Sequence, residues 1–396
     1  MKLKQTAIIL FAAAMLTACG TEKPSEVSSD ISTSTSTEET DAMNTETVYK
    51  ATEENVKLLG RTYFEEDRLY CALSGTGFEF TFTGTKCEIT VVGDSNSASA
   101  ASADNHARVG IYVNGGRVVD DMVDNRQEVY SVFESAEPRD VAVTFVKLSE
   151  SPMSTIAVTD IKITGTPIKP VPNKEKLIEF VGDSITCGYG VDDPDKSHSF
   201  STKTEDVTKA FAYKTAQALD ADYSMVSFSG YGIISGYSDG EKKVSAQTLP
   251  KYYTKLGYSW SQNGLFVPSD IDWDFSKRQP DIIVINLGTN DDSYTLTHKE
   301  RQEEYSAAYT EFLKKVRENN PDAKIVCAFG VMTDRLFDYV QLAVDNYTAE
   351  TGDENVSTLK FDVQQASDGY SADWHPSVTT HDKTAAKLTE YLKTLL

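Results

Sequence analysis

Four short clusters after residue 180 bring together a serine, a histidine, glycines and an asparagine. They are Gly182-Asp183-Ser184, Ser229-Gly230-Tyr231-Gly232, Gly288-Thr289-Asn290-Asp291 and Asp373-Trp374-His375-Pro376. A serine hydroxyl becomes a nucleophile when a base takes its proton, and histidine is the usual base because its pKa lies near neutral pH. Attack on a carbonyl places negative charge on the carbonyl oxygen, which needs hydrogen-bond donors aimed at it. The residue types therefore indicate nucleophilic attack by a serine on a carbonyl carbon.

Each cluster supplies one part of this chemistry. Ser184 is the candidate nucleophile and His375 the candidate base. The backbone N–H groups of Ser184 and Gly230 and the side-chain amide of Asn290 are the candidate donors to the oxyanion. Asp373 lies two residues before the histidine, and in an extended segment side chains at i and i+2 point the same way, so we expect its carboxylate to orient the imidazole. Otherwise a backbone carbonyl of this loop must do so, which leaves a serine–histidine dyad.

Simpler structural roles compete with these assignments. Ser184 could be only a helix N-cap, and Asn290 could be only a turn residue. His381, in the apparent final helix, competes with His375 as the base. The four clusters favour function because they occur together, each beside a predicted strand or helix.

Short apolar runs precede the clusters and predict buried strands. These runs are residues 177–181, 225–228, 282–287, 325–329 and 359–361. Between them, apolar positions recur at helical spacing over 305–316 and 336–347. Alternating strands and helices predict a doubly wound α/β domain with a parallel sheet over residues 174–396. Ligands bind beyond the carboxyl ends of such strands, which is where three of the clusters lie.

Residues 51–168 show a different pattern. Apolar and polar residues alternate in short stretches such as Phe78-Glu79-Phe80-Thr81-Phe82 and Val141-Ala142-Val143-Thr144-Phe145. A period of two is typical of strands that are buried on one face. Asn114-Gly115-Gly116 predicts a tight turn between two of them. We therefore expect an antiparallel, jelly-roll-like β-sandwich of two sheets.

The first 50 residues indicate export and anchoring. Residues 1–18 contain Lys2, Lys4 and an apolar stretch that is shorter than the roughly 20 residues of a membrane-spanning helix, as in a cleaved signal peptide. Leu16-Thr17-Ala18-Cys19 resembles a bacterial lipobox, in which Cys19 becomes the lipid-modified N-terminus; a plain signal peptide is the alternative. Residues 19–50 are rich in Ser, Thr and Glu and predict a disordered tether. We expect a lipoprotein on the outer face of a bacterial membrane, held there only by its lipid.

Composition narrows the range of partners. The net charge of −22 argues against nucleic acid, because phosphate binding needs a cationic surface. The cysteines after Cys19 show no C-x-x-C spacing, and His106, His198 and His298, which we expect at the surface, show no ligand spacing. We therefore expect no catalytic metal and no cofactor. Two of the cysteines, Cys71 and Cys87, predict either a disulfide or two buried thiols.

In this order, the four clusters resemble those of the SGNH (GDSL-type) hydrolase family. Ile185-Thr186 follow the serine where the elbow of an α/β-hydrolase requires a glycine. With the β domain in front, the segment 184–190, the run 285–291 and His375-Pro376, nearly the whole mature chain resembles carbohydrate esterase family 2. One departure is Ala372, which stands three residues before the histidine, where the wider family has an aspartate.

The resemblance implies a serine esterase that removes O-acetyl groups from polysaccharides such as xylan or glucomannan, often at a primary 6-hydroxyl, through an acyl-serine intermediate. Trp374, Tyr231 and Tyr189 are then candidates for binding the sugar ring, with ordinary packing as the alternative for each tyrosine. Two other functions stay open. One is a lipase or lysophospholipase-like esterase of the same family. The other is a surface lipoprotein that binds glycan without turnover.

Overall fold

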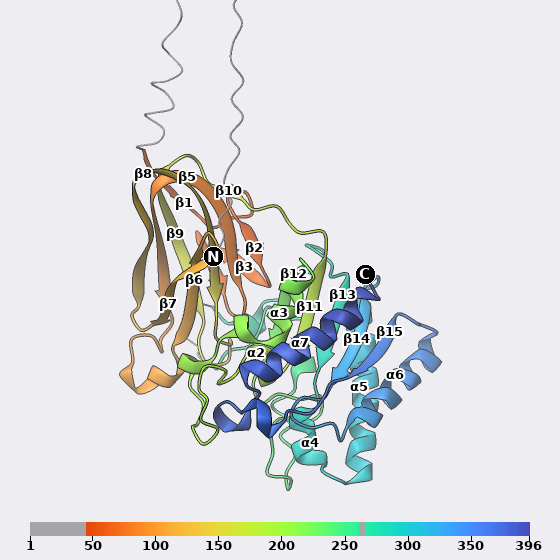
Figure 1. The fold of residues 1–396 in the computed structure, drawn as a ribbon. Coiled ribbons are helices and arrows are strands. Elements are labelled where there is room, and N and C mark those ends of the chain that lie inside the picture. The colour runs from red at the N-terminus through yellow and green to blue at the C-terminus, as the bar shows by residue number, and fades with distance from the viewer. Residues whose placement is uncertain (1–44, 261–265) are drawn as a thin grey trace, which may run out of the picture. The chain divides into compact units, whose positions relative to one another are not determined.

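The computed structural model describes residues 45–260 and 266–396. The expected signal peptide, Cys19 and most of the expected tether lie outside these residues. The described residues belong to one compact unit, in which a β-stranded first half leads into alternating strands and helices (Figure 1). Within the range expected to be a tether, residues 19–50, the described residues Glu46–Tyr49 form strand β1 and pair with β9, so this part of the prediction is wrong.

The first half is an antiparallel domain whose ten strands belong to one sheet. Its strands are β1 (Glu46–Tyr49), β2 (Lys57–Leu59), β3 (Thr62–Glu65), β4 (Arg68–Cys71), β5 (Gly77–Gly93), β6 (Ala107–Val113), β7 (Gly116–Val123), β8 (Gln127–Lys147), β9 (Ile156–Gly165) and β10 (Lys169–Pro170). Burial alternates along β5, so every second side chain packs into the core, as the period of two predicts.

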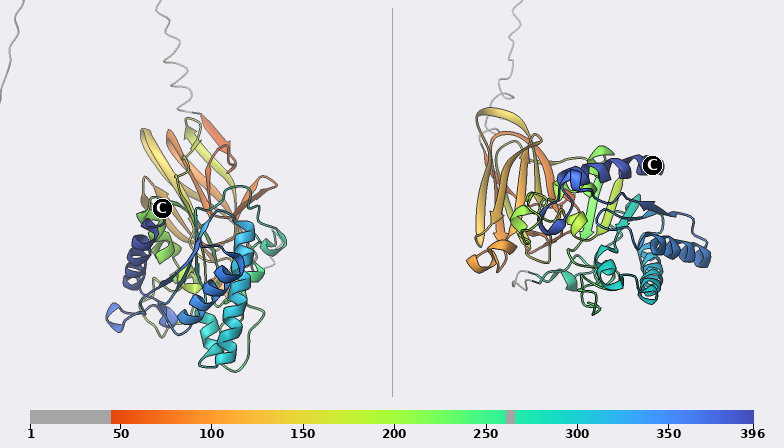
Figure 2. Two further views of the ribbon diagram at one scale, coloured as in Figure 1. Left: turned by 90° about the vertical axis from the view of Figure 1, so that its right-hand side faces the viewer. Right: turned by 60° about the horizontal axis from the view of Figure 1, so that its bottom comes forward.

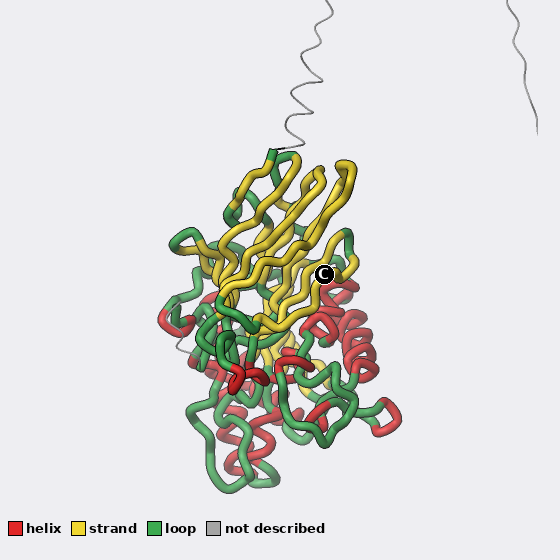
Figure 3. Tube along the Cα trace, turned by 90° about the vertical axis from the view of Figure 1, so that its left-hand side faces the viewer, coloured by secondary structure: helices red, strands yellow, loops and turns green. Residues whose placement is uncertain are grey.

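The prediction of an antiparallel, jelly-roll-like domain is confirmed, and its strands are joined in one hydrogen-bonded sheet that curls. Strands β5 and β8 contain 17 and 21 residues and pair along most of their length. Their register shifts between Gly84 and Lys86 and again between Cys87 and Glu88. Bulges of this kind bend a strand, so a single hydrogen-bonded sheet can curl around its own apolar face. Figure 3 shows these strands gathered apart from most of the helices.

The second half contains the predicted parallel sheet. Its strands lie in the order β12-β11-β13-β14-β15, and all neighbouring pairs are parallel. They are β11 (Leu177–Gly182), β12 (Asp222–Ser227), β13 (Ile282–Asn286), β14 (Lys324–Phe329) and β15 (Val356–Lys360). The strands with continuous apolar sequence are almost wholly buried, because helices cover both faces of the sheet.

The helices of this half lie in two layers (Figure 2). They are α2 (Ser184–Cys187), α3 (Phe211–Ala218), α4 (Thr289–Thr295), α5 (Lys299–Asn319), α6 (Phe337–Thr351) and α7 (Val378–Lys393). Side chains of α5 and α6 share one apolar core with the sheet, and side chains of α3 and α7 share another. The doubly wound prediction is therefore confirmed, and the short helix α2 follows β11 at the carboxyl end of the sheet.

Buried ion pairs join the two halves. Arg61, which is 0% exposed, forms a hydrogen-bonded pair with Glu179 of β11, with a shortest distance of 3.0 Å. Arg117 of β7 donates to Asp206 at 2.8 Å. A charge buried in this way needs its partner, so these pairs couple the β domain to the α/β domain.

The remaining sequence expectations concern cysteines, histidines and the membrane. Cys71 and Cys87 are buried free thiols, so the disulfide alternative is wrong. His198 and His298 have exposed rings, whereas His106 is 5% exposed and its Nε2 lies 3.0 Å from the carbonyl oxygen of Ser99. No helix among the described residues combines the length and the apolarity needed to cross a membrane.

Candidate active site

The segment Gly182-Asp183-Ser184 forms the turn from β11 into α2. Asp183 is the helix N-cap, and its carboxylate accepts a hydrogen bond from the N–H of Ile185 at 3.1 Å. Ser184 is the first helical residue, so the N-cap alternative for this serine is wrong. A Cβ at Gly182 would lie 2.1 Å from Oγ1 of Thr186, so the turn requires glycine here. The turn places the serine hydroxyl at the carboxyl end of the sheet.

Ser184 meets His375, as predicted. Oγ of Ser184 lies 2.9 Å from Nε2 of His375. Nδ1 of the same ring lies 3.1 Å from the carbonyl oxygen of Ala372 and 3.2 Å from that of Asp373. Two acceptors at Nδ1 place the ring proton there, so Nε2 offers its lone pair to the serine hydroxyl. This tautomer is the one that a general base requires.

The carboxylate of Asp373 does not orient the imidazole. Its Oδ2 accepts a hydrogen bond from the hydroxyl of Tyr189 at 2.5 Å. The prediction assumed an extended segment, but Asp373 and Trp374 have φ values of 50° and 63°. This left-handed turn directs the carboxylate away and brings two carbonyl oxygens to Nδ1. The alternative from the sequence, a backbone carbonyl as the orienting group, describes this geometry.

The ring of Tyr189 covers the imidazole. The two ring centroids lie 3.9 Å apart with an interplanar angle of 22°. Burial lowers the pKa of His375 to about 4. The neutral, proton-accepting form therefore predominates through neutral and mildly acidic pH.

The loop after β12 places Gly230 beside the site. Gly230 has φ of 80°, a left-handed conformation that favours glycine, and apart from its two chain neighbours no described residue has an atom within 4 Å of the point where a Cβ would stand. Asn290 of α4 is 6% exposed and donates from Nδ2 to the carbonyl oxygen of Tyr231 at 2.9 Å. Asp183 Oδ2 lies 3.5 Å from the same nitrogen, at the limit of a hydrogen bond. The three predicted oxyanion residues thus lie on elements that converge at one edge of the sheet.

Asp291 is a structural residue to which the sequence pattern assigned no role. Its buried carboxylate accepts hydrogen bonds from the backbone N–H groups of Ile233, Ile234 and Ser235, at 3.1, 2.7 and 3.0 Å to Oδ1. Burial raises the pKa of Asp291 to about 6. The carboxylate holds the loop that contains Gly230. Its position next to Asn290 is the signal that could have drawn attention to it.

The predicted sugar-binding aromatics have three different environments. Trp374 is 52% exposed next to His375, and the ammonium of Lys196 lies 3.8 Å from its ring centroid. Tyr189 is half-buried against the imidazole. Tyr231 is 1% exposed and packs with Phe228, so it has no free face for a sugar, and the packing alternative holds for this residue. Trp374 is the one of the three with an open surface.

His381, the competing base, is a buried packing residue of α7. It is 1% exposed, and its Nδ1 accepts a hydrogen bond from the N–H of Phe211 at 3.2 Å. Burial lowers its pKa to about 3. It is therefore neutral, and His375 is the histidine that contacts Ser184.

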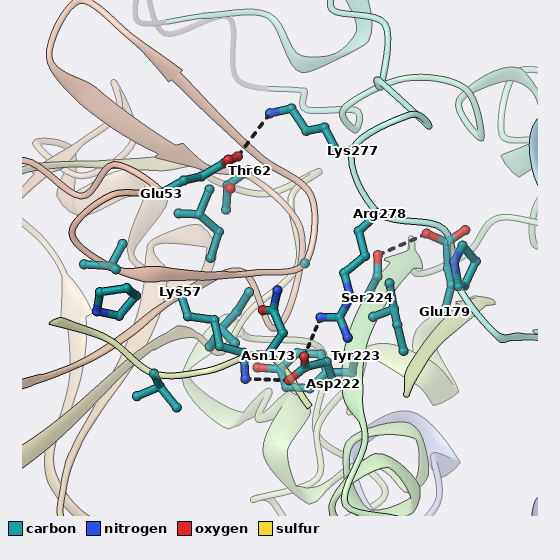
Figure 4. Close-up of a pocket in the computed structure, with 18 of the residues that line it drawn as sticks. Glu53, Lys57, Thr62, Asn173, Glu179, Asp222, Tyr223, Ser224, Lys277 and Arg278 are labelled. Atoms are coloured by element: carbon teal, nitrogen blue, oxygen red, sulfur yellow. Dashed lines mark hydrogen bonds and ion pairs between the residues drawn. The ribbon is translucent and has the colours of Figure 1, made fainter. Parts of the chain in front are cut away.

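A cavity of about 830 Å³ lies at the opposite ends of the strands (Figure 4). It is lined by the first residues of β11 and β12 and by the β domain, and neither Ser184 nor His375 lines it. Asp222 inside it pairs with Lys57 and with Arg278. These ion pairs link β2 to β12, so this region contributes to the domain contact and not to the site at Ser184.

The order of the four clusters along a doubly wound sheet, with serine and histidine in contact, is that of SGNH-type hydrolases, which are carboxylic ester hydrolases. The chain belongs to the GDSL-like lipase/acylhydrolase family, whose model matches residues 180–383. Residues 58–172 match the N-terminal model of carbohydrate esterase 2. Together, these two matches give the domain arrangement of carbohydrate esterase family 2.

Known proteins share this arrangement. The cellulase/esterase CelE of Acetivibrio thermocellus is 32% identical over 332 residues, covering 82% of this chain but only 38% of that protein. An acetylxylan esterase/glucomannan deacetylase of Cellvibrio japonicus is 24% identical over 348 residues, covering 87% and 90% of the two chains. The solved structure of a family two carbohydrate esterase from Clostridium thermocellum with cellohexaose is 28% identical, covers 86% and 98%, and has a TM-score of 0.74.

Proposed function

We propose that this protein hydrolyses O-acetyl esters on polysaccharides of the xylan or glucomannan type. The observation that carries the proposal is the 2.9 Å contact between Ser184 Oγ and His375 Nε2, with Nδ1 held by backbone carbonyls. The substrate class is supported by the activity in the name of the Cellvibrio japonicus relative. The exposed ring of Trp374 beside the histidine offers a surface for a sugar. A chain of net charge −22 also suits a neutral polymer.

The geometry supports a two-step mechanism. Oγ of Ser184 attacks the acetyl carbon while its proton moves to Nε2 of His375. The carbonyl electron pair moves to the oxygen, where the N–H groups of Ser184 and Gly230 and the amide of Asn290 stabilise it. The bond to the sugar oxygen then breaks, and the imidazolium returns the proton to that oxygen. A water molecule, deprotonated by the same nitrogen, attacks the acyl carbon; the bond to Oγ of Ser184 then breaks, acetate leaves, and the imidazolium returns the proton to Oγ.

Replacement of the nucleophile tests the proposal. Ser184→Ala should lower kcat for 4-nitrophenyl acetate by about 10⁴-fold or more, because Ser184 supplies the hydroxyl that bonds to Nε2 of His375 and no other hydroxyl of residues 45–260 and 266–396 does so. Ser135→Ala in strand β8 is the matched control and should retain parent activity. Residual turnover near that of the parent in Ser184→Ala would reject the assignment.

Two measurements test the proposed substrate: the preferred length of the acyl chain and the release of acetate from acetylated glycans. The parent protein should hydrolyse acetate esters in preference to octanoate esters and should release acetate from acetylated xylan or glucomannan. Preference for octanoate would favour the lipase-like alternative. Glycan binding that survives Ser184→Ala, in a parent that shows no turnover, would favour the binding lipoprotein.

We also infer that the protein is anchored to the outer face of a bacterial membrane through a lipid on Cys19. The support is the sequence Leu16-Thr17-Ala18-Cys19 after an apolar stretch. Expressed in a bacterium, the parent should partition into the detergent phase of Triton X-114, and Cys19→Ser should partition into the aqueous phase. A parent found in the aqueous phase would instead indicate a plain signal peptide.

A further inference from the structure

A carboxylate from the β domain reaches the backbone of the oxyanion loop. Glu150 follows strand β8 and is 0% exposed. Its Oε2 accepts a hydrogen bond from the backbone N–H of Ser229 at 2.7 Å. Ser229 directly precedes Gly230, whose N–H is a proposed oxyanion donor. The same oxygen lies 3.9 Å from Sγ of Cys187 in α2. One carboxylate group thus contacts both the nucleophile helix and the oxyanion loop.

The turn that carries Glu150 is itself held on several sides. The ammonium of Lys147 donates to the carbonyl oxygens of Ser149 at 2.6 Å and of Glu150 at 3.0 Å. Oε1 of Glu205 accepts from the N–H of Glu150 at 3.2 Å. Lys147 and Glu205 are also 0% exposed. These bonds fix the backbone of the turn from which the Glu150 side chain extends.

Burial of these groups has an energetic cost. Burial raises the pKa values of the Glu150 and Glu205 carboxyls and lowers that of Lys147 to about 8. Oε2 of Glu150 is compensated by the 2.7 Å hydrogen bond from the N–H of Ser229, whereas Oε1 has no hydrogen-bond partner among the described residues.

The same cluster could be considered as a cation site. Ligand atoms of Glu150, Cys187 and Glu205 lie within 4.8 Å of one another. The ammonium of Lys147 already supplies positive charge here, and Oε2 of Glu150 already binds an N–H group. The contacts therefore favour a role in holding the backbone over a role in binding a metal.

We infer that Glu150 is a positioning residue of the active site: its carboxylate holds the N–H of Ser229 so that the N–H of Gly230 points at the oxyanion. The inference rests on the proposed function, because it assumes that Gly230 donates in the transition state. It also assigns the β domain a part in catalysis, since this domain supplies the carboxylate.

Three substitutions of Glu150 distinguish the effect of side-chain length from the effect of its charge. Glu150→Gln keeps an acceptor oxygen at the same distance from Ser229 and should retain kcat within about threefold. Glu150→Met fills the same space without an acceptor, and Glu150→Asp keeps the charge but is one methylene shorter. Both should lower kcat for 4-nitrophenyl acetate by about tenfold or more with little change in KM, because an oxyanion donor acts mainly in the transition state.

Asp222→Asn is the matched control. Asp222 is another buried carboxylate, and it lies at the other end of β12, where it pairs with Lys57. Its substitution should lower Tm and leave kcat at the parent value. A purely structural role for Glu150 would produce this same pattern in Glu150→Met and would reject the inference.

Hydrogen exchange gives a readout that does not depend on turnover. Backbone amides of residues 229–235 should exchange about tenfold faster in Glu150→Met or Glu150→Asp than in the parent and in Glu150→Gln. If Glu150→Met does not fold, the exchange rates and kcat of Glu150→Asp and Glu150→Gln test the role of Glu150. A parent that lacks turnover would reject the proposed function while the exchange data still test Glu150. Parent-like kcat and exchange in the Asp or Met variant would reject the role of Glu150 alone.

Discussion

At the scale of single residues, the orientation of the catalytic base depends on the backbone. The carbonyl oxygens of Ala372 and Asp373 hold Nδ1 of His375, while the Asp373 carboxylate bonds to Tyr189. In a serine–histidine–aspartate triad, the carboxylate itself holds the ring in its tautomer. Here a side-chain substitution leaves both acceptors in place, so the side chain of Asp373 should contribute little to catalysis.

Asp373→Asn tests this view. Asparagine tolerates the left-handed φ of 50° and can still accept from Tyr189, so the turn should persist. We expect kcat/KM for 4-nitrophenyl acetate within about threefold of the parent, whereas the equivalent change in a triad costs about 10⁴-fold. A loss of that size would show that the carboxylate acts on the imidazole. His375→Asn is the comparison that should abolish turnover.

The pH dependence of the reaction follows from the burial of His375. The base must be neutral to accept a proton, and burial lowers its pKa to about 4. Activity should therefore be constant from pH 8 to 6 and fall only as the pH drops through about 4 to 5. The measurement is a profile of kcat/KM in the parent and in Tyr189→Leu, which removes the stacked ring and should move the midpoint upward. A parent midpoint near 6.5 would contradict the prediction.

At the scale of elements, one carboxylate at the start of α4 organises the oxyanion loop. Asp291 accepts three backbone N–H groups of residues 233–235. Asp291→Asn places an N–H₂ group against these donors and should lower the free energy of unfolding by about 1–3 kcal/mol, with a fall in kcat as the loop loosens. Urea unfolding and steady-state kinetics measure the two effects.

Asp292→Asn is the matched control for that prediction, because it lies next in the same helix. Its carboxylate bonds to Arg335, whose side chain is 42% exposed. The Asp292 carboxylate is itself buried, but asparagine keeps an acceptor for Arg335 and water can reach the guanidinium, so the substitution should cost less than Asp291→Asn, about 1 kcal/mol. Equal effects of the two substitutions would mean that the loop does not depend on Asp291.

The sequence predicts the elements better than their exact shapes. Continuous apolar runs identified the buried strands. Strand β15 begins earlier than its apolar run, at Val356, because an edge strand can contain partly exposed polar residues, here Ser357 and Thr358. The period of two identified the β strands but not their single curled sheet, which depends on bulges near Gly84 and Cys87. The turn at Asp373 was missed because its left-handed backbone leaves no pattern in the spacing of residues.

At the scale of the whole molecule, the two domains share buried polar contacts that no local pattern reveals. Glu150 contacts Ser229 across 79 positions of sequence, and Arg61 contacts Glu179 across 118. Each residue looks like an ordinary charged residue in the sequence, and only the fold makes it buried and paired. This explains why the motifs at the strand ends could be assigned from sequence while the residues that support them from the β domain could not.

The pair of Arg61 and Glu179 should make the two domains unfold together. Arg61 also donates to the carbonyl oxygens of Tyr253 and Lys255, and Glu179 accepts from Ser224. Arg61→Met leaves a buried carboxylate without its cation and should lower the free energy of unfolding by about 3–5 kcal/mol. Arg61→Met combined with Glu179→Gln should recover part of this loss, because the uncompensated charge is then absent.

Urea unfolding followed in parallel by circular dichroism and by esterase activity measures this coupling. Coincident transitions are expected in the parent, because the pair lies between the β domain and the first strand of the α/β domain. If the domains were independent, Arg61→Met would shift neither transition, or the two signals would separate in the parent. A double variant no more stable than Arg61→Met would instead show that the contacts of Arg61 with Tyr253 and Lys255, and not its charge pair, hold the domains together.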